Sequence, residues 1–210
     1  MSGSGPVGIV DYGAGNIGSV MNALARLGAD ARLVRGPEEL SGASPYEKIV
    51  FPGDGHFGTA MASLERAGYA RALREWIAAD RPFLGICIGL QILFQRSEEA
   101  PDTAGLGVIP GDVRRFPGPK VPQIGWNSTE ARDSSCLFKG IPADSFFYYI
   151  HSYYASPADP CLTAAYTDYC LRYCAAVERG ALSAVQFHPE KSGVWGLRLL
   201  ENWLGGTDAG

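Results

Sequence analysis

The first hundred residues alternate short apolar runs with segments of helical periodicity, and this alternation constrains the fold more than any other feature. The apolar runs predict strands at 7–11, 31–34, 48–51 and 82–86. Helical spacing of apolar residues covers 19–28, 59–68, 69–79 and 89–99. Asn16 is suited to cap the first of these helices. The order predicts an α/β fold with a mainly parallel sheet and helices on both faces.

From about Gly105 the pattern changes to shorter, β-rich segments separated by turns. These segments predict antiparallel strands that extend the parallel core into a mixed sheet. The last apolar segment, 193–205, predicts a helix that packs Trp195, Leu199 and Leu200 onto the sheet. A length of 210 residues is typical of one domain. We expect a single domain over 7–205, preceded by a flexible leader at 1–6.

Composition excludes several classes of partner. The net charge is −4 and no long Lys/Arg run is present, which argues against nucleic acid or an anionic membrane. No apolar run approaches the roughly 20 residues that span a bilayer, and no signal peptide opens the chain. We expect a cytoplasmic protein.

The cysteines predict neither a disulfide framework nor a zinc site. Their number, five, is odd, no C-x-x-C occurs, and only three histidines are present. Four of them lie in no motif and are predicted to be structural, mostly as small buried hydrophobes: Cys136, Cys161, Cys170 and Cys174.

The loop after the first strand, DYGAGNIGSV, matches the G-x-G-x-x-G fingerprint of dinucleotide-binding folds. Glycine makes up 27 of the 210 residues, and the same spacing recurs at 3/5/8 and 53/55/58. A pattern that also occurs in a Ser/Gly leader without a preceding strand does not by itself predict NAD binding.

The segment GICIG, Gly85 to Gly89, joins a strand to a helix and has the form of a nucleophile elbow with Cys87 at its tip. At a helix N-terminus the dipole favours a thiolate, and the backbone N–H of Ile88 faces a developing oxyanion. The alternative is a buried structural cysteine before a core helix.

His188 lies in AVQFHPEKS, at the end of an apolar run. In an extended strand His188 and Glu190 share a face, so the carboxylate can orient an imidazole that takes the proton from Cys87. Alone, H-P-E favours a surface ion pair beside a proline turn. Together with the elbow about 100 residues earlier, it indicates nucleophilic catalysis by a thiol.

PFLGICIGLQILF together with QFHPEKSG resembles the class I glutamine amidotransferases, and the resemblance covers nearly the whole chain. It implies a Cys-His-Glu triad that hydrolyses the side-chain amide of glutamine and passes ammonia to a synthase partner. No cofactor is implied.

Three further stretches, DYGAGN, PQIGWN and HPEKSG, are similar to the glutaminase subunits of imidazole glycerol phosphate synthases. This resemblance implies a role in histidine biosynthesis and a heterodimer with a (β/α)₈ cyclase subunit, which uses the ammonia. It makes the first glycine-rich loop part of the face toward the cyclase and implies no NAD.

The same resemblance makes PGDGHFG the loop that completes the oxyanion hole, with Gly53, the Asp54 N–H and Ile88 as its parts. Many relatives carry an apolar residue at the position of Asp54, so we expect this carboxylate to point to solvent. From the residues alone, an ordinary strand-to-helix turn is the alternative.

Contacts with glutamine are implied for Gly55, Gln91, Glu99, Ser152 and Tyr153, with Glu98 open as an alternative to Glu99. The partner face is implied to include Asn16, Trp126, Asn127, Tyr148 and Lys191. We expect docking of the cyclase to turn the Gly53–Asp54 peptide and so raise kcat.

Four other functions stay open at this point. The nearest is a glutaminase that serves pyridoxal phosphate, anthranilate or GMP synthesis, against which PQIGWN and DYGAGN argue. A stand-alone cysteine hydrolase would turn over without a partner. A non-catalytic binding module and an NAD-dependent oxidoreductase are further alternatives.

Overall fold

The computed structural model describes residues 5–13 and 16–205. Its strands are β1 (Val7–Val10), β2 (Ala31–Val34), β3 (Lys48–Phe51), β4 (Phe83–Ile86), β5 (Phe94–Ser97), β6 (Ile109–Arg115), β7 (Gln123–Ser128), β8 (Glu130–Ala131), β9 (Phe146–His151), β10 (Tyr153–Pro157), β11 (Thr163–Tyr169), β12 (Leu171–Arg179) and β13 (Leu182–Val185). Its α-helices are α1 (Ile17–Arg26), α2 (Phe57–Arg66), α3 (Tyr69–Ala78), α4 (Ile88–Gln91) and α5 (Gly193–Gly205). The 3₁₀ turns are η1 (Pro37–Leu40), η2 (Pro160–Leu162) and η3 (Pro189–Lys191).

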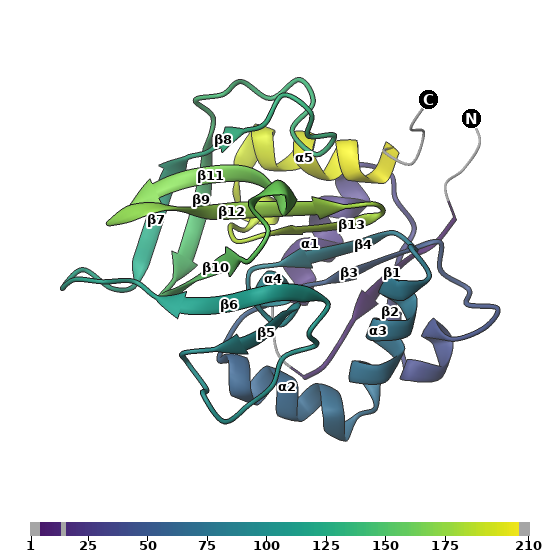
Figure 1. The fold of residues 1–210 in the computed structure, drawn as a ribbon. Helices are drawn as coiled ribbons and strands as arrows, with labels where there is room; N and C mark the ends of the chain where they lie inside the picture. Colours follow the sequence, from purple (N-terminus) through teal and green to yellow (C-terminus); the bar gives the residue numbers. More distant parts are fainter. Residues whose placement is uncertain (1–4, 14–15, 206–210) are drawn as a thin grey trace.

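The central sheet runs in the order β2-β1-β3-β4-β13-β12-β10-β6-β5, with β11 and β8 attached beside β12 (Figure 1). Strands β2, β1, β3, β4 and β13 pair in parallel, whereas β13, β12, β10 and β6 pair antiparallel. The predicted mixed, mainly parallel α/β sheet is therefore confirmed, with the antiparallel strands added at one side.

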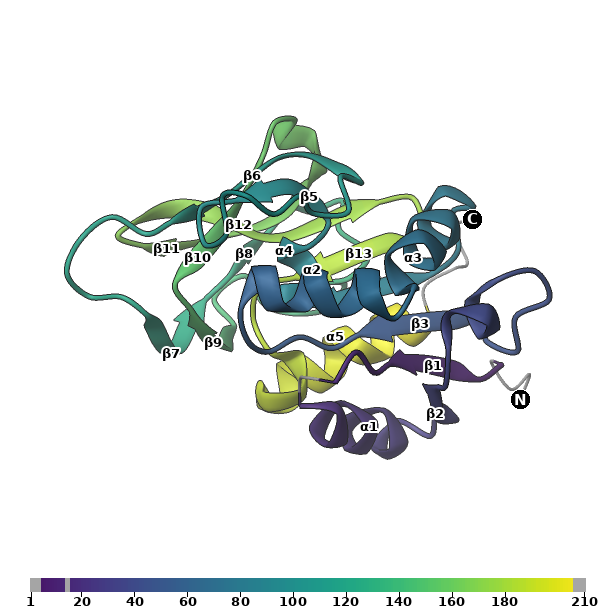
Figure 2. The same cartoon turned by 90° about the horizontal axis from the view of Figure 1, so that it is seen from below.

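Two apolar cores lie on opposite faces of this sheet. Ile49 and Phe51 of β3 pack with residues of α2 and α3, whereas Val50 packs with residues of α1 and α5. Figure 2 shows these helix pairs on either side of the parallel strands. The alternation follows from the period of two along a strand, and all four residues of β3 are buried.

The helix predicted at 89–99 is wrong for most of its length. Helix α4 ends at Gln91, and 94–97 form β5, which pairs in parallel with β6 at the sheet edge. The N–H groups of Leu106 and Ile109 donate to the carbonyls of Ile92 and Leu93. Bonds to a distant segment thus replace the local helical bonds that the periodicity favoured.

Strands β7 and β9 form a separate two-stranded ribbon. One face of the ribbon buries Gln123, Phe147, Tyr149 and His151, and the other face is open. At Ser152 the chain leaves the ribbon and enters β10 of the central sheet.

Strand β1 begins at Val7 and helix α5 ends at Gly205. Residues 1–4 of the predicted leader lie outside the described residues. No helix in the described part of the chain is long and apolar enough to cross a membrane.

Candidate active site

Cys87 stands at the sharp turn between β4 and α4, in a backbone conformation that L-residues rarely adopt (φ 54°, ψ −104°). Flanking glycines allow this turn. A Cβ on Gly85 would collide with the Gly89 carbonyl, and one on Gly89 would lie 2.5 Å from the Phe51 carbonyl oxygen. The predicted elbow is present, and its positive φ is the kind of strain that concentrates at functional sites.

His188 and Glu190 form a buried pair, with 2.8 Å between Nδ1 and Oε1 and side chains 2% and 1% exposed. The predicted pairing is present, but its predicted basis, an extended strand, is wrong. Strand β13 ends at Val185, and Pro189 starts the turn η3, so the carboxylate reaches the ring from a 3₁₀ turn. A proline ring favours such a turn start because its φ is fixed and it has no N–H.

The second ring nitrogen of His188, Nε2, is buried and has no hydrogen-bond partner among the described residues. Burial by itself lowers the pKa of His188, but the neighbouring Cys87 and Glu190 raise it to about 10. The structure thus brings the three predicted residues together. Glu190 bonds Nδ1 of His188, and Cys87 lies close enough to raise the pKa of the ring.

A chain of amide hydrogen bonds supports the thiol. The Gln91 amide nitrogen donates to the Tyr153 carbonyl oxygen (3.0 Å) and to Gln186 Oε1 (3.2 Å). Because a carbonyl can only accept, this fixes the orientation of both amides and leaves Gln186 Nε2 to donate to Cys87 Sγ at 3.6 Å. Gln186 is completely buried.

The predicted oxyanion loop lies against the elbow. A Cβ on Gly53 would contact the Ile88 side chain and lie 2.5 Å from the Ile86 carbonyl oxygen, so only glycine fits. The side chain of Asp54 is exposed, as expected. Its N–H, however, donates to the Tyr12 hydroxyl at 3.4 Å. Gly55 has a positive φ of 106°.

Two of the expected glutamine contacts already have partners in the protein. Gln91 is 4% exposed and its amide belongs to the chain described above. Glu99 Oε2 accepts from the Phe57 N–H at 2.7 Å, beside the oxyanion loop. Glu98 instead accepts from the Arg115 N–H on β6, so of the two carboxylates only Glu99 bonds the segment that follows the oxyanion loop. Ser152 lies between β9 and β10, half-buried.

The open face of the β7–β9 ribbon carries a cluster of large apolar side chains, the apolar patch: Ile124, Trp126, Phe146 and Ile150, each 39–60% exposed. The rings of Tyr148 and Trp126 are in edge-to-face contact, with their centroids 6.1 Å apart. The patch adjoins the site, because the Cys87 thiol donates to the Ile150 carbonyl (3.9 Å) and the His188 N–H to the Tyr148 carbonyl (2.9 Å).

The remaining predicted partner residues lie outside the apolar patch, on η3, at the start of α1 and on β7. Lys191 ends η3 and is half-buried. Asn16 caps α1 by accepting from the Ser19 N–H, as predicted. Asn127 donates to the Asp168 carbonyl at 2.8 Å, so its amide serves the β11–β12 hairpin.

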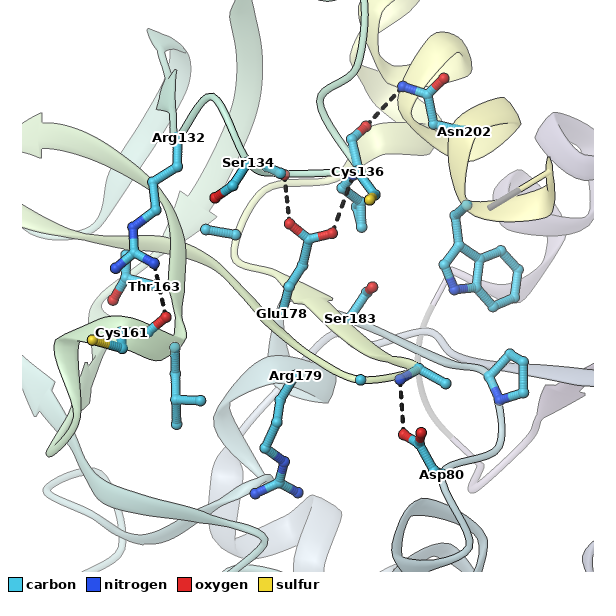
Figure 3. A pocket seen from close by; sticks show the side chains of 18 residues that line it. Asp80, Arg132, Ser134, Cys136, Cys161, Thr163, Glu178, Arg179, Ser183 and Asn202 are labelled. Atoms are coloured by element: carbon cyan, nitrogen blue, oxygen red, sulfur yellow. Dashed lines mark hydrogen bonds between the residues drawn. The ribbon is translucent and has the colours of Figure 1, made fainter. Parts of the chain in front are cut away.

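A further cavity lies away from Cys87. It measures about 660 Å³ and lies at the amino ends of β4 and β13, whereas Cys87 follows the carboxyl end of β4 (Figure 3). Its charged groups already have partners: Glu178 accepts from the Leu137 N–H, and Arg132 donates to the Cys161 carbonyl.

The expectation of mostly buried structural cysteines is wrong for three of the four. Cys174 is buried, and burial raises its pKa to about 12. Cys136, Cys161 and Cys170 are exposed. They lie in a loop, in η2 and at the tip of the β11–β12 hairpin. The described residues hold no group of three or more His, Cys, Asp or Glu side chains placed for a metal ion.

Comparison with known proteins agrees with this geometry. The family model for glutamine amidotransferase class-I matches residues 8–205. The chain belongs to the class I glutamine amidotransferases. Among the relatives of this amidotransferase is the imidazole glycerol phosphate synthase subunit HisH of Dehalococcoides mccartyi (strain ATCC BAA-2266 / KCTC 15142 / 195), 46% identical over 94% of this chain and 96% of that protein. The corresponding subunit of Synechococcus sp. (strain JA-3-3Ab) is 45% identical over 93% and 91%.

Solved structures support the fold of this amidotransferase. The structure of PurLQS from Thermotoga maritima includes a chain with a TM-score of 0.76 at 17% identity, covering 96% of this chain and 98% of that one. A crystal structure of a glutamine amidotransferase gives 0.74 at 21% identity, covering 95% and 98%.

Two residues of this amidotransferase site were not predicted from the sequence, Gln186 and Tyr12. A polar Gln186 inside the apolar run AVQF, two residues before His188, was a usable signal. Tyr12 gave none, because an aromatic residue at a strand end usually belongs to the core.

Proposed function

We propose that this chain is the glutaminase subunit of an imidazole glycerol phosphate synthase and supplies ammonia to a separate cyclase subunit in histidine biosynthesis. The observation that carries the proposal is Cys87 at the strained elbow beside the buried His188–Glu190 pair. The HisH relatives, at 43–46% identity over most of the chain, support the choice of synthase.

In the proposed reaction Cys87 reacts as a thiolate, its proton being held by His188. The sulfur attacks the side-chain carbonyl carbon of glutamine, and the C=O electron pair moves to oxygen. The N–H of Ile88, which as the first residue of α4 lacks an intrahelical acceptor, faces this oxygen. With its pKa raised to about 10, His188 is protonated at neutral pH and can give a proton to the leaving nitrogen.

Departure of ammonia leaves a γ-glutamyl thioester on Cys87. A water molecule then attacks the thioester carbon, His188 takes a proton from it, and the C–S bond breaks to release glutamate. Glu190 keeps the ring oriented through Nδ1 in both halves of the reaction.

The apolar patch, together with Tyr148, Lys191, Asn16 and Asn127, is proposed to face the cyclase. An exposed cluster of aromatic and aliphatic side chains is typical of a protein interface. The cluster is linked directly to the triad, because backbone carbonyls of β9 accept hydrogen bonds from both Cys87 and His188. A cyclase seated there would cover the site that produces ammonia.

The test is release of glutamate and ammonia from glutamine, with and without a cyclase subunit and its nucleotide ligand. Wild type is compared with Cys87→Ala and with Cys136→Ala, which removes an exposed thiol outside the site. Strong stimulation by the cyclase that only Cys87→Ala abolishes is the expected result.

Two other outcomes would overturn parts of the proposal. Hydrolysis that needs Cys87 but ignores the cyclase would keep the triad and reject this synthase. Absence of Cys87-dependent hydrolysis under every condition would reject the glutaminase.

A further inference from the structure

Tyr12 follows β1 and Asp54 follows β3, and these two strands are neighbours paired in parallel. Their carboxyl ends therefore meet at one edge of the sheet, which brings the two loops together. The Tyr12 hydroxyl donates to the Asp54 carbonyl oxygen at 3.1 Å and accepts from the Asp54 N–H at 3.4 Å. One hydroxyl thus bonds both peptide groups on either side of Asp54.

The position of this hydroxyl is well defined. Tyr12 is 7% exposed, and its ring stacks on that of Phe51 with centroids 4.8 Å apart and 13° between the planes. Phe51 is the last residue of β3 and leads through Pro52 directly into the loop. Burial raises the pKa of Tyr12 to about 12, so the hydroxyl keeps the proton that it donates.

The bond matters because the Asp54 N–H is the group expected to complete the oxyanion hole. In this structure that N–H is directed at the Tyr12 oxygen. An N–H with an acceptor in the protein is not free to bond a developing oxyanion, so the peptide must turn before it can do so.

We propose that Tyr12 is a positioning residue that holds the Asp54 peptide away from the oxyanion and so keeps the unpartnered subunit slow; this rests on the proposed glutaminase function. Tyr12 follows β1 and is four residues before Asn16, the N-cap of α1, which is proposed to face the cyclase. Docking of the cyclase against Asn16 would shift the hydroxyl and release the peptide.

The test is Tyr12→Phe, which removes the hydroxyl and keeps the stacked ring. Tyr46→Phe is the control, because Tyr46 is 5% exposed and its hydroxyl bonds the Glu39 carboxylate (2.7 Å) and the Leu33 carbonyl (3.0 Å), away from this loop. Loss of one oxyanion donor typically costs 10²–10³ in kcat. We expect Tyr12→Phe to raise glutamine hydrolysis without the cyclase by about 10-fold or more, and to leave the cyclase-stimulated rate near that of wild type.

A second measurement separates the oxyanion from the thiol. Alkylation of Cys87 by iodoacetamide forms no oxyanion and is expected to be the same in wild type, Tyr12→Phe and Tyr46→Phe. An unstimulated rate in Tyr12→Phe that equals wild type, or falls below it, would overturn the positioning role. Failure of the function itself looks different, because wild type would then show no Cys87-dependent hydrolysis even with the cyclase.

Discussion

The side-chain amide of Gln186 donates a hydrogen bond to Cys87 Sγ at 3.6 Å, from a position that water does not reach. The backbone carbonyl of Tyr153 accepts from the Gln91 amide nitrogen, which also donates to Gln186 Oε1. These two bonds fix the orientation of the Gln186 amide. A buried donor on the sulfur stabilises the thiolate more than the thiol, because hydrogen bonds to charged groups are the stronger ones.

Gln186→Met keeps the length of the side chain and removes the donor. We expect the rate of Cys87 alkylation by iodoacetamide at pH 7.5 to fall by about 10-fold, since a hydrogen bond to a charged group contributes roughly 1.5–3 kcal/mol. Mass spectrometry measures the rate, with the exposed thiols of Cys136 and Cys170 as internal references. Gln95→Met, an exposed change on β5, is the control. Equal Cys87 rates in both variants would show that Gln186 does not act on the sulfur.

Glu190→Gln replaces the carboxylate at Nδ1 of His188 by an amide of the same shape. We expect the cyclase-stimulated kcat to fall by roughly 10²–10⁴-fold, because the amide lacks the charge that favours the protonated ring and can present its NH₂ group, instead of an acceptor, to Nδ1. The pKa of His188 is expected to move down from its raised value, which an NMR titration of the ring measures. A fall of less than threefold would contradict the assignment of Glu190.

Stability is expected to decrease as pH rises above neutrality. The pKa of His188 is about 10 in the folded protein and near 6.5 unfolded, so its contribution is complete below pH 6.5 and lost as pH rises through 10. The expected loss is of the order of 5 kcal/mol, because each pKa unit corresponds to about 1.4 kcal/mol. Urea unfolding of wild type and His188→Asn at pH 6, 8 and 10 measures it, and the advantage of wild type should shrink at each step. A constant difference would contradict the raised pKa.

Gly53→Ala is expected to destabilise the chain by about 1–3 kcal/mol and to reduce glutamine hydrolysis at least 10-fold. The added methyl would lie 2.5 Å from the Ile86 carbonyl oxygen and 2.7 Å from the Gly89 nitrogen, and backbone atoms cannot move aside as a side chain can. Gly18→Ala, where a Cβ meets nothing within 4 Å, is the control. Thermal unfolding measures the stability of the two variants, and glutamine hydrolysis measures their activity. Similar values for both variants would show that the loop is not tightly packed against the elbow.

Local sequence determined the parts of this protein that depend on neighbours in the chain. Strand β4 and the glycines around Cys87 specify the elbow, because a sharp turn with positive φ needs room on both sides. The His188–Glu190 pair spans two residues, and therefore followed from the sequence even though the backbone that joins them is a turn and not a strand. Helices α1, α2 and α3 followed from apolar periodicity.

Tertiary structure decided the features whose partners are far apart in the sequence. Residues 94–97 became a strand because β6 offered backbone partners at the sheet edge. The Tyr12–Asp54 bond spans 42 residues and the Gln186–Cys87 bond spans 99, so no local sequence pattern predicts either bond. Sequence thus supplied the reactive groups, whereas the packing of strand ends against one another decided which hydrogen bonds hold them. The reason is that propensity acts over a few residues, and a buried donor takes whichever acceptor the fold brings to it.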